Sequence, residues 1–164
     1  GQLLKNLGAA YFDLGDYKKA IEYQQQSLTI AREIKTREGE GIALANLGYA
    51  YLSLEDYPKA VEYQKQSLVI AREIKNRAIE SITLTNIGFA FYKQGNLSLA
   101  ESTLIEGIKV YESLRSRELK DSEKVSIFET QSFVYRILQQ VLIAQNKTDA
   151  ALEISERGRG RAFV

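Results

Sequence analysis

The 164-residue chain contains no cysteine, histidine, tryptophan or methionine. Without cysteine there is neither a disulfide framework nor a thiolate nucleophile, and without histidine there is neither a serine–histidine catalytic pair nor an ordinary zinc site. Most enzyme chemistry is therefore excluded, and we expect a protein that is not an enzyme and uses no cofactor. Because a natural chain starts with methionine, its absence also predicts a piece of a longer polypeptide.

The sequence also lacks signals for membranes and secretion, and its net charge is small. No apolar run approaches the roughly 20 residues that a membrane-spanning helix needs, and no secretory signal opens the chain. The 22 basic and 21 acidic residues leave a formal charge of +1, which is too balanced for a protein dedicated to nucleic-acid phosphates. We therefore expect a cytoplasmic protein whose partners include neither nucleic acid nor membrane.

An internal repeat with a period of 40 residues dominates the sequence. Residues 6–11, Asn-Leu-Gly-Ala-Ala-Tyr, return at 46–51 as Asn-Leu-Gly-Tyr-Ala-Tyr and at 86–91 as Asn-Ile-Gly-Phe-Ala-Phe. A less regular fourth copy, beginning near Leu138, is offset from the third by 51 residues, which adds about eleven residues around 117–129. A repeat signature of this kind predicts a single array. We place its repeats at about 1–37, 38–77 and 78–116, with an irregular longer repeat at about 120–160.

Each repeat is predicted to form a helical hairpin. Apolar residues recur at helical spacing in its first helix, and Asp16 and Asp56 stand where they can cap a second helix. Gly48 and its equivalents lie inside the first helix, at a cost of about 1 kcal/mol relative to alanine, so we expect close helix packing there against the small Ala60. One hairpin cannot bury its apolar face alone, whereas stacked hairpins can, which predicts an all-α solenoid. In the first repeat the apolar residues of the first helix are Leu4, Leu7, Tyr11 and Leu14.

A family pattern runs through these hairpins, carried in the first repeat by Leu7, Gly8, Tyr11, Gly15, Asp16, Ala20 and Ser27. Over nearly the whole chain it resembles the tetratricopeptide repeat (TPR). This resemblance implies a right-handed superhelix whose concave groove binds protein or peptide partners. The 40-residue period and the phrase Ala-Arg-Glu-Ile-Lys at 31–35 and 71–75 are similar to the long-helix variant of LGN/Pins-like scaffold proteins.

The end of the chain carries a second resemblance. Residues 156–163, Glu-Arg-Gly-Arg-Gly-Arg-Ala-Phe, are similar to the junction after repeat arrays in bacterial proteins with a caspase-like CHAT protease domain downstream. It implies that the repeats are the regulatory or sensor region of a larger effector. The three arginines could instead contact nucleic acid or an acidic partner, but the interleaved glycines favour a fraying helix end.

The TPR resemblance implies that the first helices line the groove through the face that carries a periodic asparagine. Asparagine both donates to and accepts from a peptide backbone, and aromatic rings provide stacking and apolar pockets. The alternative is that the rings pack between repeats and the asparagines brace turns. In the first repeat the same face carries Phe12 and Asp13. The predicted peptide groove consists of Asn6, Asn46, Asn86, Tyr49, Phe89, Leu52, Tyr92, Lys5 and Lys93.

Other charged residues are interpreted structurally. The charges from Arg32 to Arg37 are expected to form a solvated helix face. Glu22 and Glu62 recur one repeat apart without any histidine, so neither paired-carboxylate catalysis nor metal binding is expected. We predict a protein-interaction scaffold that binds a peptide or partner segment in its groove. The alternatives are the regulatory region of a larger effector and self-association through the apolar ends of the array.

Overall fold

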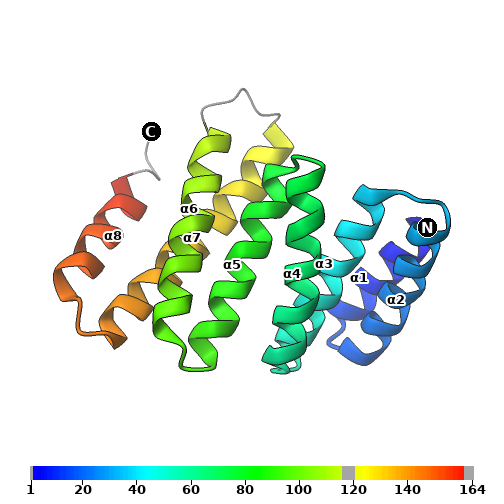
Figure 1. Cartoon of the computed structure of the whole chain (residues 1–164), viewed down its shortest axis with the longest axis horizontal. Coiled ribbons are helices and arrows are strands. Elements are labelled where there is room, and N and C mark those ends of the chain that lie inside the picture. Colours follow the sequence, from blue (N-terminus) through cyan, green and yellow to red (C-terminus); the bar gives the residue numbers. More distant parts are fainter. Residues whose placement is uncertain (1, 116–120, 161–164) are drawn as a thin grey trace.

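The computed structural model describes the backbone of residues 2–115 and 121–160 and the side chains of residues 3–114 and 132–159. All regular secondary structure in these ranges is α-helical, which confirms the predicted all-α solenoid (Figure 1). Within the same ranges, no helix is both long and apolar enough to cross a membrane. The helices are α1 (Gln2–Asp13), α2 (Tyr17–Glu33), α3 (Arg37–Ser53), α4 (Tyr57–Glu73), α5 (Arg77–Lys93), α6 (Leu97–Arg115), α7 (Asp121–Ala144) and α8 (Thr148–Gly160).

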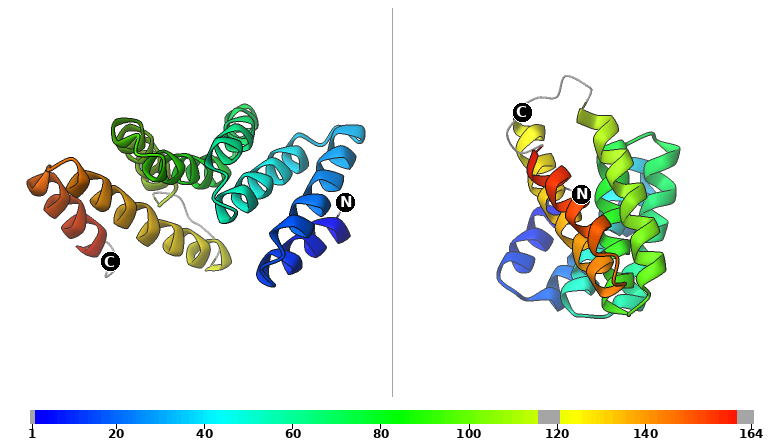
Figure 2. Two further views of the ribbon diagram at one scale, coloured as in Figure 1. Left: turned by 90° about the horizontal axis from the view of Figure 1, so that it is seen from below. Right: turned by 90° about the vertical axis from the view of Figure 1, so that its left-hand side faces the viewer.

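Each helix packs against the next one in the chain, and the first helices of successive hairpins also touch. Contacts between α3 and α5, and between α5 and α7, connect hairpins directly. Figure 2 (left) shows α4 and α6 on one side of the array and α7 on the opposite side. The face formed by α3, α5 and α7 is therefore separate from the outer helices α4 and α6.

The turns within the hairpins form as the sequence predicts. The Asp16 and Asp56 carboxylates accept hydrogen bonds from the backbone N–H groups of Lys19 and Lys59, at 3.1 and 3.3 Å, and so cap α2 and α4. The residue before each of these caps is left-handed, with φ of 77° at Gly15 and 59° at Glu55. Glycine takes this conformation without the steric cost that a side chain brings.

The fourth hairpin follows the predicted offset at its turn. Asn146, which lies 51 residues after Gly95, has a left-handed φ of 59° where Gly95 has 78°. Helix α7 has 24 residues against 17 in α5, so a large part of the added length is helical. Residues 117–120 of the predicted insertion lie outside the described residues, as do residues 161–163 of the arginine-containing ending.

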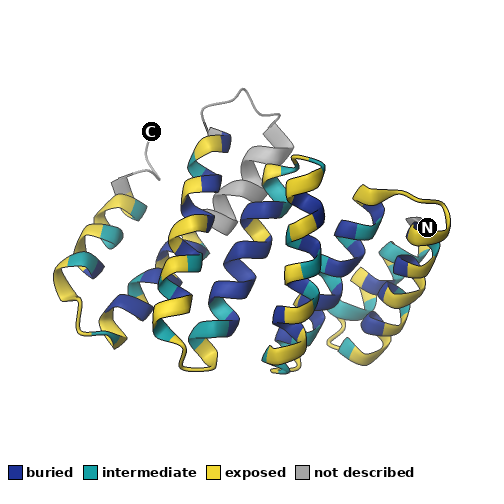
Figure 3. Cartoon of the chain, in the orientation of Figure 1, coloured by how far each residue is buried: buried dark blue, intermediate teal, exposed yellow. Residues whose placement is uncertain are grey.

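Burial follows the predicted apolar faces except at the hairpin ends. Buried side chains line the surfaces where helices meet, as Figure 3 shows in dark blue. Leu14 and Leu54, however, are 78% and 40% exposed, so the expectation that Leu14 belongs to the buried face is wrong. Both follow the last residue of a first helix, at the tip of a hairpin, beyond the helix that would have to cover them.

The glycines inside the first helices mark close packing, as predicted, but the contacting residue differs from the expected alanine. A Cβ added at Gly48 would lie 2.6 Å from Cγ of Gln64, and one at Gly88 would lie 2.6 Å from Cγ of Leu104. Each glycine thus makes room for the long side chain in the middle of the second helix. Gln64 is fully buried there and donates from Nε2 to the Ala45 carbonyl at 3.0 Å.

The first hairpin exposes apolar surface that the second hairpin buries. Leu3 on α1 is 71% exposed, whereas Ala43, its equivalent on α3, is fully buried. The difference arises because α2 packs against α3, while none of the described helices covers the corresponding face of α1. Self-association through this end of the array stays a prediction.

Candidate peptide groove

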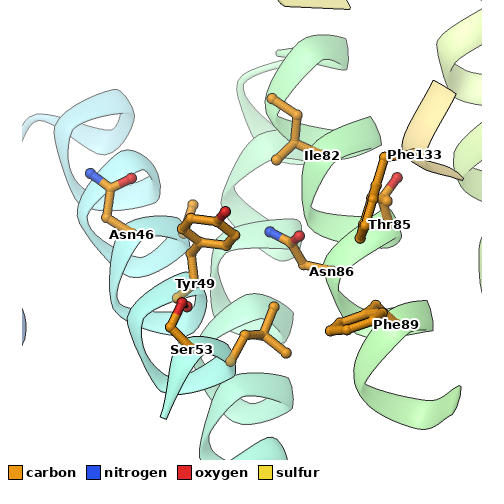
Figure 4. Close-up of a pocket in the computed structure, with 10 residues that line it drawn as sticks. Asn46, Tyr49, Ser53, Ile82, Thr85, Asn86, Phe89 and Phe133 are labelled. Atoms are coloured by element: carbon orange, nitrogen blue, oxygen red, sulfur yellow. The ribbon is translucent and has the colours of Figure 1, made fainter. Parts of the chain in front are cut away.

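A hollow with a volume of about 570 Å³ opens between α3, α5 and α7, and we call it the central pocket (Figure 4). The outer helices α4 and α6 contribute nothing to its lining. First helices of three successive hairpins therefore meet around one opening. The lining residues are Ala45, Asn46, Tyr49, Leu52 and Ser53 from α3, Ile82, Thr85, Asn86 and Phe89 from α5, and Phe133 from α7.

Aromatic and aliphatic side chains form most of the wall. The rings of Phe89 and Phe133 lie 5.7 Å apart in a tilted arrangement, and Nζ of Lys93 lies 5.5 Å above the Phe89 ring. Tyr49 and Ile82 are 49% and 38% exposed, so they present apolar area to solvent at the rim. An apolar side chain that entered the pocket would remove this area from water.

Two asparagine amides supply the available polar groups. Asn86 is only 9% exposed, and its side chain extends from α5 into the pocket (Figure 4). Among the described residues none hydrogen-bonds to the side-chain amide of Asn86 or Asn46. The hydroxyls of Thr85 and Ser53, by contrast, donate to backbone carbonyls one turn earlier, at 2.9 and 3.3 Å. The Asn86 amide atoms are not among the buried atoms that lack a partner, so a ligand group that pairs with Asn86 replaces water there and gains about 1 kcal/mol per net hydrogen bond.

Ion pairs hold the helices that carry the pocket. Glu40 on α3 accepts from Nε of Arg32 at 2.9 Å and from Nη1 of Arg37 at 2.7 Å. Burial raises the pKa of Glu40, but the hydrogen bonds from the two arginines outweigh burial and leave the pKa below its ordinary value. Arg32 and Arg37 are exposed, as the expected solvated face requires, and they also connect helices: Arg32 joins α2 to α3, and Arg37 joins α3 to α4 through Glu73.

The same arrangement recurs one repeat later. Glu80 on α5 is 3% exposed and accepts from Nε of Arg72 at 3.0 Å and from Nη1 of Arg77 at 2.6 Å. Arg72 also pairs with Glu106 on α6 at 2.5 Å. These ion pairs connect α4 to both α5 and α6.

A smaller hollow of about 190 Å³ lies one repeat earlier, between α1, α2 and α3, and we call it the N-terminal pocket. The rings of Phe12 and Tyr49 stack at its edge, with centroids 4.8 Å apart. Asn46 and Tyr49 line both hollows, so the two pockets are neighbours along the same face. The N-terminal pocket is lined by Gly8, Ala9, Phe12, Asp13, Ala20, Gln24, Asn46, Tyr49 and Ala50.

Five of the nine predicted groove residues gather in the central pocket: Asn46, Tyr49, Leu52, Asn86 and Phe89. The other four lie elsewhere. Lys93 sits above the ring of Phe89, and Tyr92 packs against the C-terminal core. Asn6 is exposed on α1, and Lys5 borders a separate hollow where α1, α2 and α3 come together.

Sequence reasoning missed Ile82 and Phe133, whereas Thr85 lies on the first-helix face that the resemblance assigns to the groove. Phe133 lies 51 residues after Ile82, which is the offset of the fourth repeat, so aligning the repeats places both side chains on the same face. The side chains described in residues 3–114 and 132–159 include no group of three carboxylates that could hold a metal ion. Glu22 and Glu62 are both exposed.

Arg157 and Arg159 lie in helix α8. Helix α8 continues through Gly158 and ends at Gly160, so a helix end lies where it was expected, and its fraying stays a prediction. Arg157 donates from Nη2 to both carboxylate oxygens of Glu112 on α6, at 2.8 Å each. This ion pair fastens α8 to α6.

Similarity to known proteins agrees with this architecture. The chain is 36% identical over 74 residues to Tetratricopeptide repeat protein 28 of Mus musculus and of Homo sapiens, a match that covers 44% of the chain and 3% of each relative. It thus spans a very small part of these curated relatives.

Solved structures show the same fold. The crystal structure of Aspartyl phosphate phosphatase F from Bacillus subtilis is 18% identical with a TM-score of 0.83, over 97% of this chain and 39% of that one. The crystal structure of a putative kinesin light chain with nearly identical TPR-like repeats, from Podosopora anserina, is 15% identical to this chain with a TM-score of 0.61. The match covers 97% of this chain and 93% of that one.

The family model for the tetratricopeptide repeat matches twice, at residues 1–73 and 42–113. Together these matches cover more than half of the chain, and they include the glycines and asparagines of the first three repeats. The finer similarity to LGN/Pins-like scaffolds and to CHAT-domain proteins stays a prediction. The chain belongs to the tetratricopeptide repeat family.

Proposed function

We propose that the chain is a protein-interaction module that binds an extended peptide segment, from a partner or from its own parent protein, in the central pocket. The observation that carries the proposal is the Asn86 side chain, which extends into a largely apolar hollow and has no hydrogen-bond partner among the described residues. A volume of about 570 Å³ lies within the range of ligand-binding pockets.

The binding mode follows from the two kinds of lining. The Asn46 and Asn86 amides each offer a donor and an acceptor to the main chain of the peptide, whatever its sequence. An apolar side chain of the peptide enters between Tyr49, Phe89 and Phe133. With about 1 kcal/mol for each net hydrogen bond and one or two aromatic anchors, a dissociation constant in the micromolar range, about 8 kcal/mol, is reasonable.

A random nine-residue peptide library displayed on phage tests this proposal. Selected peptides are synthesised with a fluorescent label and titrated by anisotropy against the wild type and two glutamate variants. Ile82→Glu places a carboxylate at the rim of the pocket, and we expect it to weaken binding by tenfold or more because the apolar anchor loses its environment. Val69→Glu is the matched control, since Val69 is 64% exposed on α4, outside the pocket.

Asn46→Ala then separates groove contact from packing. We expect weaker peptide binding with little change in melting temperature, because the Asn46 amide makes no hydrogen bond to a described residue. A large fall in melting temperature would favour the packing role of the asparagines. Peptides that bind the wild type and Ile82→Glu equally well would refute the central pocket as the binding site.

A further inference from the structure

The N-terminal and central pockets are built at equivalent positions of successive repeats but differ in chemistry. Phe12 and Asp13 of the first repeat correspond to Leu52 and Ser53 of the second, each pair being 40 residues apart. The N-terminal pocket therefore has a carboxylate where the central pocket has a hydroxyl. A peptide lying along both pockets meets different side-chain preferences at each.

Hydrogen-bond acceptors and aromatic rings dominate the N-terminal pocket. Asp13 is exposed, and no described basic side chain lies within ion-pairing distance of it; Lys19 pairs with Asp16 instead, at 3.4 Å. Gln24 lines the pocket, is 3% exposed, and has a buried Oε1 without a hydrogen-bond partner. A cation pairs with the exposed Asp13 carboxylate and is attracted to an open face of the neighbouring aromatic rings.

We infer that the N-terminal pocket receives an arginine or lysine side chain of the peptide whose apolar side chain fills the central pocket. This inference rests on the proposed function, and it names a feature of the ligand that the central pocket does not determine. Phe12 and Tyr49 provide the stacked rings, and Asp13 provides the countercharge.

The Asp13 carboxylate has no evident role in stabilising its own helix. Asp13 is the last residue of α1, where the partial negative charge of the helix C-terminus disfavours a carboxylate. At the equivalent position of α3, the Ser53 hydroxyl donates to the Tyr49 carbonyl at 3.3 Å and so satisfies a backbone acceptor near the helix end. Replacing Asp13 by a neutral residue is therefore compatible with folding.

The spacing of the pockets sets the register of the ligand. Packed helices lie about 8–10 Å apart, and an extended strand advances about 3.3 Å per residue. Neighbouring pockets along the array thus accept side chains about three residues apart. The expected ligand has a basic residue and an aromatic or aliphatic residue with two residues between them, in either chain direction.

The peptides selected from the phage library test this register and charge. We expect lysine or arginine to be enriched three residues from an apolar anchor. Asp13→Asn should weaken these peptides about twofold to fivefold at low salt, and less at high salt, because the ion pair is lost while the contact with the aromatic rings remains. Glu22→Gln removes the same charge from α2 outside both pockets and should leave affinity unchanged.

A double-mutant cycle with a second set of peptides isolates the contact between Asp13 and the basic residue of the peptide. Replacing the basic residue of the peptide by glutamine should weaken binding to the wild type more than binding to Asp13→Asn, in which only the contact with the rings is left to lose; melting temperatures are measured for both chains. Peptides that lack a basic residue and respond to Ile82→Glu but not to Asp13→Asn would overturn this inference and leave the proposed function intact. Peptides indifferent to Ile82→Glu, or a selection that yields no binder, would overturn both.

Discussion

Gly48→Ala tests how closely the first and second helices of a repeat pack. A Cβ at position 48 would lie 2.6 Å from Cγ, 2.7 Å from Nε2 and 2.8 Å from Cδ of Gln64. No carbon or nitrogen atom tolerates such distances, so Gln64 would have to move. Gln64 is fully buried, and the nearest contact is to the root of its side chain, so rotating its tip does not relieve the overlap.

Opposing effects decide the size of the change. Overpacking a buried site costs about 1–3 kcal/mol, and loss of the hydrogen bond from Gln64 to the Ala45 carbonyl costs about 1 kcal/mol more. Alanine in place of glycine returns about 1 kcal/mol through helix propensity. We therefore expect Gly48→Ala to destabilise the chain by about 2 kcal/mol, which lowers the melting temperature by about 4–8 °C for a chain of this length.

The first repeat offers a matched control. A Cβ at Gly8 would meet first the Nε2 tip of Gln24 at 2.5 Å, whereas Cδ and Cγ are 3.1 and 3.3 Å away. The tip can swing aside, so Gly8→Ala should cost clearly less than Gly48→Ala.

Urea unfolding followed by circular dichroism at 222 nm gives the free energies of the single variants and of Gly48→Ala in a Gln64→Ala background. Without the Gln64 side chain, Gly48→Ala should become neutral or stabilising. A Gly48→Ala chain as stable as the wild type, or a cost that persists without Gln64, would refute the packing argument.

Two further predictions concern charged groups. Glu80→Gln should destabilise the chain by about 1–2 kcal/mol in urea unfolding, which is less than for a fully buried ion pair because both arginine partners are nearly half exposed. Glu40→Gln should cost less, because the Glu40 carboxylate is less buried than that of Glu80. Equal costs for the two variants would contradict the role assigned to burial. Hydrogen bonds from Lys147 lower the pKa of Glu101, burial raises it, and a hydrogen bond from Gln145 lowers it further, so the pKa lies below its ordinary value. The ionised Glu101 therefore contributes its full stabilisation above the ordinary glutamate pKa, and this contribution is lost as the pH falls through the lowered pKa. Glu101→Gln should make the free energy of unfolding, measured by urea unfolding, fall less steeply at acid pH. An unchanged acid dependence would contradict this prediction.

The sequence specified the fold well because the signals are local and repeated. Apolar spacing predicts the helices, and Asp16 and Asp56 predict where the second helices begin; both depend on contacts within a few residues. Repetition then favours stacking of the hairpins, which buries the apolar faces between neighbours. The exposure of Leu14 was not predicted, because helical spacing alone does not show where a helix ends.

The candidate site was only partly predictable, since it depends on three helices far apart in the chain. Asn86 and Phe89 follow from the repeat, but Phe133 reaches the central pocket from α7, in a repeat whose offset differs. Tyr92 and Leu52 illustrate the reverse problem. Both carry apolar side chains on first helices, yet Tyr92 packs into the C-terminal core, and Leu52 is 7% exposed at the pocket wall. Spacing alone does not separate an anchor for a ligand from an anchor for the neighbouring hairpin.

A comparison of the first two repeats within the chain contains a sharper signal for the site. Between positions 4 and 14 they differ from positions 44–54 only at 5, 9, 12 and 13. Steps of three and four residues place these positions on one face of a helix. Their counterparts Ala45, Tyr49, Leu52 and Ser53 all line the central pocket, and Ala9, Phe12 and Asp13 line the N-terminal pocket. Between these two repeats the helix contacts are therefore kept alike while the face that lines the pockets differs, and under the proposed function that face is where selectivity for a ligand would arise.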